Sequence, residues 1–421
     1  MMRAIGPLVA VMVVFTLSVG PNILGVRAQE ATPLPDPLDL MPVEVKIGPL
    51  IVAGVTDDVE ITDDSRHVIN DLHIGNIILM GRNVDSPEQV LKLTQELQAL
   101  ATAANGVPLL IGTDQEGGLV QRLNYYSGFT LMPPASLAGA AQSPELMREY
   151  GRIVGAEMSA VGVSLAFAPV LDVNDNPTNP VIGELGRSFG TAPELVEESA
   201  LPFIEGLHDA GVATTGKHFP GHGSTTSDSH LSLPYVDKDR AALDAVDIAP
   251  FRAAVDAGID AIMPAHVVYK ALDPSGMPAT ISEPIQTGLL RGELGFDGVI
   301  VTDDLGMQGI MEIAPPGESG VRAILAGADI LTCVRMTTSG SCQPEMIDDL
   351  HAGLVKAVQD GRISMERLDE SVRRILALKE KYRVGPATGE GLDAIQGAAH
   401  QRAVADLLEA AADRREEEGR P

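Results

Sequence analysis

Short apolar runs alternate with longer amphipathic segments along most of the chain. The amphipathic segments at residues 86–105, 143–162 and 192–211 predict helices, because each begins with a capping or first-turn residue. The apolar runs predict eight β-strands, at residues 49–55, 76–81, 109–114, 165–173, 213–218, 261–266, 299–303 and 329–334. This alternation is typical of an α/β fold, and we expect a (β/α)8 TIM-type barrel with a single catalytic domain. Helical patterns lie between most of the strands, and the pattern predicts none between the first two.

The N-terminal segment has a different pattern from the rest of the chain. A positive start at Arg3 precedes an uncharged run that ends only at Arg27, and Ala28 supplies a small residue at a cleavage position. These features predict a signal peptide over residues 1–28 and an exported protein, extracellular or in the cell envelope. An uncleaved N-terminal anchor is the alternative, because the uncharged run is long enough to cross a bilayer. We expect membrane attachment only through this segment.

Composition changes along the chain predict three further regions. Residues 29–46 are rich in Pro and acidic side chains, which indicates a linker. Residues 47–384 contain the predicted strands and form the expected barrel. Residues 385–421 are rich in Ala and charged side chains without a strand pattern, which predicts a helical tail.

Charge and cysteine content narrow the possible functions. The chain has 58 acidic side chains against 30 Lys and Arg, a net charge of −28, which excludes a surface that wraps nucleic acid. The sequence lacks Trp, which disfavours an accessory sugar-binding module built on Trp side chains. In an exported protein Cys333 and Cys342 can form a disulfide, and two unpaired thiols are the alternative.

Ionisable side chains follow five of the predicted strands where each strand ends. Active sites of this fold lie at the C-terminal ends of the strands, so these side chains are expected to meet at one barrel mouth. Helix capping would account for one or two of them, but not for all five strands. Burying so many ionisable groups costs stability unless they are paired or used in catalysis. The residues are Asp114, Asp172, Lys217, His218, His266, Asp303 and Asp304.

Two chemistries could use these carboxylates and imidazoles. In the first, a divalent metal held by histidines and a carboxylate activates water for hydrolysis; the candidate ligands are His218, His222, His230 and His266. In the second, one carboxylate attacks a glycosidic carbon and another group transfers protons without a metal. Phe219-Pro220-Gly221 separates His218 from His222, and this loop sequence cannot place both on one helix face. The spacing therefore favours the metal-free chemistry.

Four ordered motifs resemble a known family. The segment KHFPGHGSTTSDSH, residues 217–230, is similar to a signature of bacterial β-N-acetylglucosaminidases of glycoside hydrolase family 3. DQEGGLVQR at 114–122, GRSFG at 186–190 and TDDLGM at 302–307 resemble the same family in the same order. The resemblance covers about residues 48–384 and implies a (β/α)8 barrel.

The resemblance implies a role for each motif residue. Asp303 matches the nucleophile, and His230 with Asp228 matches an acid/base dyad on a loop. The residues that match sugar-binding positions are Asp114, Arg122, Arg187, Lys217 and His218. Family members usually carry a short I-G-x-R-S-F run around this arginine. Here the run reads IGELGRSFG, so Arg187 matches the family position only when two additional residues are allowed before it. No metal or other cofactor is expected.

The activity implied is that of a retaining exo-β-N-acetylglucosaminidase. Its expected substrate is a carbohydrate, terminal N-acetylglucosamine on peptidoglycan or chitin fragments. We expect Asp172 and Asp304 to support the site without being catalytic. For His222 and His266 two roles stay open, support of the site and contact with the ligand. The alternatives are a family 3 β-glycoside phosphorylase, a metal-dependent hydrolase on a TIM barrel, and a sugar-binding protein without catalysis.

Overall fold

The computed structural model describes residues 37–55, 59–334 and 344–417 and contains two compact units, Met1–Leu40 and Met41–Pro421. Of the first unit it describes a 3-10 helix, Pro37–Leu40. The predicted signal peptide or anchor lies outside the described residues. Cys333 is disulfide-bonded, and Cys342, the other cysteine of the chain, also lies outside the described residues. All further description concerns the second unit.

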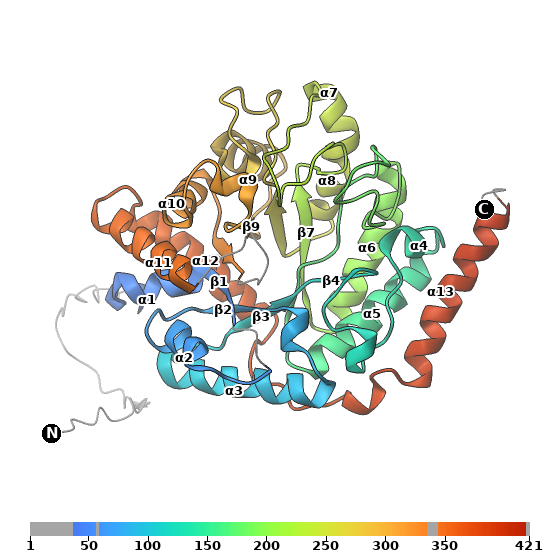
Figure 1. Ribbon diagram of the computed structural model, residues 1–421, viewed down its shortest axis with the longest axis horizontal. Helices are drawn as coiled ribbons and strands as arrows, with labels where there is room; N and C mark the ends of the chain where they lie inside the picture. Colours follow the sequence, from blue (N-terminus) through green and yellow to red (C-terminus); the bar gives the residue numbers. More distant parts are fainter. Residues whose placement is uncertain (1–36, 56–58, 335–343, 418–421) are drawn as a thin grey trace, which may run out of the picture. The chain divides into compact units, whose positions relative to one another are not determined.

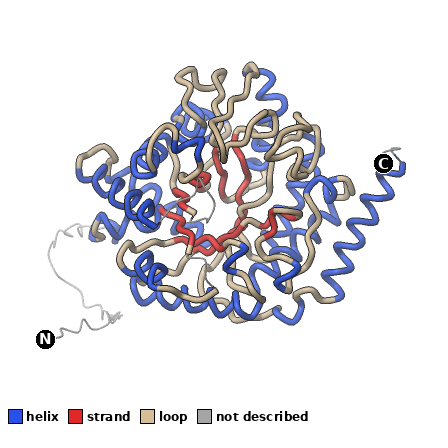
Figure 2. The backbone as a smooth tube through the Cα atoms, viewed as in Figure 1, coloured by secondary structure: helices blue, strands red, loops and turns tan. Residues whose placement is uncertain are grey.

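Eight parallel strands close into a barrel, and helices surround it (Figures 1 and 2). Going round the barrel, the order is β1-β10-β9-β8-β7-β6-β3-β2. The structure therefore confirms the predicted (β/α)8 fold, with a strand within or overlapping each predicted run. The strands are β1 (Ile51–Gly54), β2 (Asn76–Leu79), β3 (Leu110–Thr113), β6 (Leu165–Ala166), β7 (Ala213–Phe219), β8 (Ala261–Pro264), β9 (Val299–Asp304) and β10 (Ile330–Cys333).

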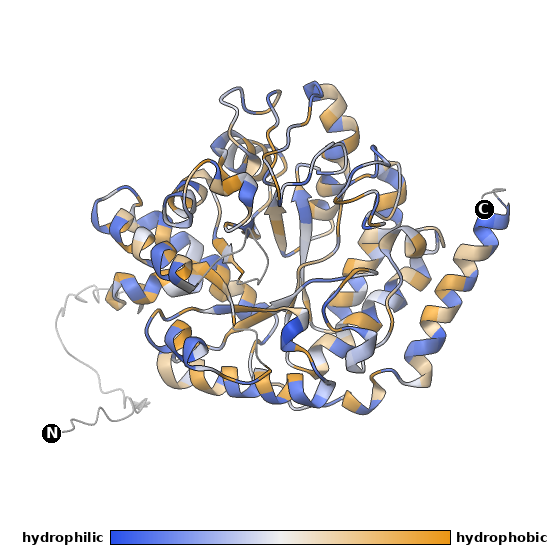
Figure 3. Cartoon of the chain, in the orientation of Figure 1, coloured by the Kyte–Doolittle hydropathy of each residue, from blue (hydrophilic) through white to orange (hydrophobic). Residues whose placement is uncertain are grey.

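The helices around the barrel carry both apolar and polar positions along their length (Figure 3). In α3 the buried residues Val90, Leu93 and Leu97 recur at helical spacing, while Lys92 and Glu96 are exposed. The predicted helices correspond to α3, α5 and α6. The α-helices are α1 (Val43–Ile47), α2 (Asp63–Asn70), α3 (Pro87–Asn105), α4 (Ala135–Gly139), α5 (Pro144–Ala160), α6 (Pro193–Asp209), α7 (Arg240–Ala242), α8 (Ala249–Asp256), α9 (Gln308–Met311), α10 (Pro316–Ala326), α11 (Pro344–Gln359), α12 (Met365–Lys381) and α13 (Ala398–Glu417).

The structure differs from the sequence pattern in two elements. Helix α2 lies between β1 and β2, where no helix was expected; Thr62 caps it by accepting a hydrogen bond from the Ser65 N–H (3.3 Å). The expected strand at 165–173 is only two residues long. Beyond Ala166 the segment continues as buried irregular backbone that includes Pro169, which has no N–H to donate, and it meets β7 again at the isolated bridge from Val170 to Lys217.

Both ends of the described unit pack against helices that surround the barrel. The predicted linker overlaps α1, in which buried Lys46 lies 2.7 Å from Asp369 of α12, so the compact unit begins before residue 47. At the C-terminal end α13 packs along α5 (Figure 1), and His400 Nδ1 lies 2.7 Å from the Glu157 carboxylate. Among the described residues, no helix combines the length and apolar content needed to cross a bilayer.

Candidate active site

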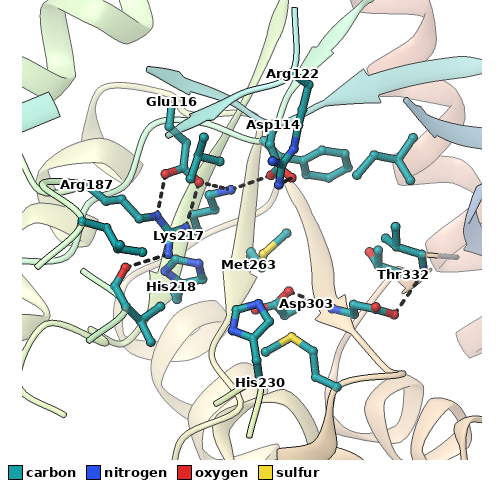
Figure 4. A pocket seen from close by; sticks show the side chains of 18 of the residues that line it. Asp114, Glu116, Arg122, Arg187, Lys217, His218, His230, Met263, Asp303 and Thr332 are labelled. Carbon is teal, nitrogen blue, oxygen red and sulfur yellow. Dashed lines mark hydrogen bonds and ion pairs between the residues drawn. The ribbon is translucent and has the colours of Figure 1, made fainter. Parts of the chain in front are cut away.

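A pocket at the C-terminal ends of the strands brings together all eight residues proposed for catalysis and sugar binding (Figure 4). They come from six different segments of the chain, which meet only because the barrel closes. Asp114 follows β3, Arg122 follows β5 (Val120–Gln121), Arg187 lies between β6 and α6, Lys217 and His218 belong to β7, Asp228 and His230 lie on the loop after β7, and Asp303 belongs to β9.

One wall of the pocket is a network of carboxylates and cations. The Lys217 ammonium lies 2.8 Å from Asp114 Oδ1 and 2.7 Å from Glu116 Oε1. Arg187 binds Glu116 through two parallel hydrogen bonds of 2.7 and 2.8 Å, and Arg122 lies 3.3 Å from Asp114. Burial opposes ionisation of Asp114, but Lys217 and Arg122 outweigh it and lower the pKa of that carboxyl below its ordinary value. The network therefore carries full charges, with side chains suited to bind sugar hydroxyls.

Glu116 is the member of this network that the sequence analysis did not assign. It lies on β4 (Gln115–Gly117), part of a small hairpin with β5 inserted after β3, and its side chain is only 2% exposed. The one indication of its role in the sequence is its position in the motif DQEGGLVQR, two residues after Asp114. The hairpin places Glu116 between Arg187 and Lys217, so it orients two residues expected to contact the sugar.

A buried carboxylate orients the next wall of the pocket. Asp172 Oδ2 lies 2.7 Å from His218 Nδ1 in a hydrogen bond. Its Oδ1 accepts two more hydrogen bonds, from the backbone N–H groups of His218 (3.1 Å) and His222 (2.6 Å). Burial opposes ionisation of Asp172, but His218 lowers the pKa of this carboxyl. This arrangement fixes the ring of His218 and leaves its Nε2 for a ligand, as expected for a supporting role of Asp172.

Asp303 is the penultimate residue of β9 and faces the same pocket (Figure 4). Its carboxylate accepts the N–H of Asp304 at 2.8 Å. Burial would raise the pKa of Asp303, but the nearby imidazoles of His266, His218 and His230 prevail and lower it to about 2. The side chain is thus ionised at every physiological pH, which is the state a carboxylate nucleophile requires.

The pKa of the neighbouring Asp304 is shifted in the opposite direction. Its Oδ1 accepts the N–H groups of Gly306 and Val334, each at 3.0 Å. Burial raises the pKa of Asp304 to about 7, and the charge of Asp303 adds to this effect. Two adjacent carboxyls therefore differ in protonation, and only Asp303 is reliably anionic.

His230 and Asp228 lie on the loop between β7 and α7. His230 Nδ1 is 2.7 Å from Asp228 Oδ1, which also accepts the backbone N–H of His230 at 2.8 Å. The side chains are 49% and 29% exposed, so the dyad lies at the rim of the pocket that contains Asp303. The contact to Asp228 fixes the imidazole orientation and leaves Nε2 for proton transfer.

The other two histidines serve the architecture around the pocket. His266 Nε2 lies 2.9 Å from the backbone oxygen of Asp304, and its Nδ1 lies 2.6 Å from Thr280 Oγ1. His222 is buried and bonded to the hydroxyls of Thr225 and Ser229. Within residues 37–55, 59–334 and 344–417, no three His, Cys, Asp or Glu side chains form a group that could hold a metal ion.

Similarity to known proteins extends over most of the barrel. The family model described as Glycosyl hydrolase family 3 N terminal domain matches residues 42–378. A β-hexosaminidase of Alkalilimnicola ehrlichii is 40% identical over 294 residues, which cover 68% of this chain and 81% of the relative. The structure of a glycoside hydrolase family 3 β-N-acetylglucosaminidase from Paenibacillus sp. str. FPU-7 is 43% identical, with a TM-score of 0.82 over 88% of this chain and 69% of that chain. NagZ from Neisseria gonorrhoeae is 34% identical, with a TM-score of 0.70 over 86% and 97% of the two chains.

Proposed function

Because the chain belongs to glycoside hydrolase family 3, we propose that it is a retaining exo-β-N-acetylglucosaminidase that removes terminal N-acetylglucosamine from glycans. The similar proteins named β-hexosaminidase and β-N-acetylglucosaminidase support the choice of an amino sugar. The observation that carries the proposal is that ionised Asp303 and the His230–Asp228 dyad line one pocket.

In the proposed reaction, the Asp303 carboxylate attacks the anomeric carbon of the terminal sugar. The glycosidic bond breaks as His230 donates its Nε2 proton to the leaving oxygen, and a covalent glycosyl-Asp303 forms. His230 then accepts a proton from water, which attacks the anomeric carbon and releases Asp303. Two inversions give net retention. Asp228 stabilises the imidazolium that donates this proton and that forms again when His230 takes the proton of water.

The charged wall of the pocket supports exo action. Asp114, Glu116, Arg187 and Lys217 close one side of the pocket with groups that bind hydroxyls, so we propose that this side holds the non-reducing end. His218 completes that binding site through Nε2. Peptidoglycan or chitin fragments are the proposed source of the substrate, and export through the N-terminal segment is the proposed location.

A comparison of two aryl glycosides tests this function. We expect hydrolysis of the aryl β-N-acetylglucosaminide to exceed that of the matching β-glucoside, with the β-anomer formed first in NMR spectra. The α-anomer as first product would contradict the retaining mechanism, and a faster β-glucoside would contradict the amino-sugar assignment. Faster turnover in phosphate with release of a sugar 1-phosphate would indicate the phosphorylase alternative. Loss of activity in EDTA with recovery in zinc would indicate the metallohydrolase.

A further inference from the structure

Ser229, between the two dyad residues, points in the opposite direction from them. Asp228 and His230 face the pocket, whereas Ser229 is only 2% exposed. Its Oγ lies 3.0 Å from Nε2 of His222. The Asp-Ser-His triplet therefore has two residues directed to the ligand and one directed into the protein.

The partner of Ser229 is held rigidly. His222 is buried, and its backbone N–H donates to Asp172 at 2.6 Å. Its Nδ1 lies 2.9 Å from Thr225 Oγ1, and its carbonyl accepts a hydrogen bond from the Asn179 side chain at 2.8 Å. Burial, with a contribution from His218, lowers the pKa of His222 to about 4, so the ring is neutral at neutral pH. A neutral ring has one donor and one acceptor nitrogen, which two hydroxyl partners satisfy.

A second contact comes from the segment that follows the nucleophile. The backbone N–H of Gly309, in α9, donates to the carbonyl of Ser229 at 3.2 Å. A Cβ at position 309 would lie 2.9 Å from that carbonyl oxygen and 2.8 Å from the carbonyl oxygen of Ser232. Real Cβ atoms essentially never approach backbone oxygens so closely. The dyad loop thus rests directly on Gly309, with no space for a side chain.

We propose that Ser229 and Gly309 are positioning residues that hold the acid/base dyad over Asp303. The Ser229 hydroxyl joins the loop to the ring of His222 by a hydrogen bond. Gly309 has no side chain, so the loop can contact the backbone of the segment that follows Asp303. The two contacts act on the one residue that lies between Asp228 and His230, so they set the place of both. This inference rests on the proposed function and assigns neither residue to the chemistry itself.

Leaving-group dependence tests the positioning role of Ser229. We expect Ser229→Ala to lower kcat/KM about tenfold or more for a poor, alkyl leaving group, since small displacements of an acid/base group are costly. An activated aryl group needs little protonation and should change far less. Ser229→Thr, which keeps the hydroxyl, should restore the rate. Ser232→Ala is the matched control, because the Ser232 hydroxyl makes no hydrogen bond with any described residue.

Gly309→Ala should reproduce the selective loss, because it displaces the loop without removing a polar group. If this variant does not fold, the Ser229→Ala and Ser229→Thr pair decides alone. An equal loss for both leaving groups in Ser229→Ala, or no loss, would overturn the inference.

A double variant separates this inference from the proposed function. Ser229→Ala added to His230→Ala should cause no further loss, because the residue it positions is gone. If His230→Ala itself shows no dependence on the leaving group, the proposed function fails. If His230→Ala shows it and Ser229→Ala does not, only the positioning role fails.

Discussion

Arg187 and Glu116 form a buried, two-pronged ion pair, with Nε to Oε2 at 2.7 Å and Nη2 to Oε1 at 2.8 Å. The two residues are 71 positions apart: Arg187 lies in the loop after β6, and Glu116 lies on β4 of the hairpin that follows β3. Arg187 also donates to the Val181 carbonyl at 3.0 Å, which fixes the remaining edge of its guanidinium. The pair therefore fixes where the arginine points, and we expect Glu116 to influence sugar binding through Arg187.

Glu116→Gln tests this control. The variant keeps the size of the side chain but removes the charge that Arg187 and Lys217 share, so two buried cations lose a partner. We expect KM to rise and kcat/KM to fall about 100-fold, and the free energy of unfolding to fall by about 3–5 kcal/mol. Steady-state kinetics and urea unfolding measure the two effects. Glu184→Gln, an exposed glutamate before Arg187, is the control and should change neither. A normal KM in Glu116→Gln would contradict the assignment.

Asp303→Asn tests the nucleophile. An amide of the same shape cannot attack the anomeric carbon, so turnover should fall by about 10⁴-fold or more. The variant should still bind N-acetylglucosamine, measured by calorimetry, because the charged wall of the pocket is intact. In the wild-type protein, mass spectrometry of a quenched reaction should find one sugar attached to the peptide that contains Asp303. An undiminished rate in Asp303→Asn would remove it as the nucleophile.

His230→Ala tests the acid/base. Loss of the proton donor should lower kcat/KM by about 10² to 10⁴-fold for alkyl leaving groups and far less for activated aryl groups. Asp228→Asn should give a smaller loss of the same kind, because the imidazole remains but its orientation and positive charge lose support. Rates across a series of leaving groups measure the dependence. A parallel loss for all of them would mean that His230 binds the sugar and does not transfer the proton.

Asp304→Asn tests the electrostatics next to the nucleophile. In the folded protein the pKa of Asp304 is about 7, above its ordinary value of 3.8, so the fold favours the neutral carboxyl. Between pH 4 and 7 the unfolded chain has lost this proton and the folded chain retains it, so this group lowers stability as pH rises. Asparagine does not titrate, so the stability of the Asp304→Asn variant does not fall with pH for this reason. The difference in free energy of unfolding between the variant and the wild type should therefore rise between pH 4 and 7 by about 4 kcal/mol and stay constant above pH 7. A pH-independent difference would contradict the raised pKa.

The sequence was most informative where periodicity and chemistry coincide. Each barrel strand is buried on both faces, so an apolar run such as 299–303 predicts it, and the polar residue at its end marks the mouth. No role was predicted for Glu116, because its position in the pocket depends on a short hairpin. The two strands of that hairpin have only three and two residues, too few to give a periodic pattern in the sequence. Apolar content alone extended the fourth predicted strand to Val173, whereas the regular strand ends at Ala166. The hydrogen bond between Ser229 and His222 depends on the conformation of the loop after β7. The Ser, Thr and Asp residues of that loop show no pattern from which this conformation could be predicted.

The C-terminal helix offers a test in which stability and activity should separate. Buried Glu157 of α5 accepts the backbone N–H groups of Thr130 (3.0 Å) and Gln396 (3.2 Å) and pairs with His400 Nδ1 at 2.7 Å, so one carboxylate ties α13 to the barrel. His400→Ala removes one partner of this buried group and should lower the free energy of unfolding by about 1–3 kcal/mol. None of these side chains lines the active-site pocket, so kcat/KM at 25 °C should stay unchanged. Glu409→Ala, exposed on the same helix, is the control. A change in kcat/KM without a change in unfolding would show that α13 communicates with the pocket.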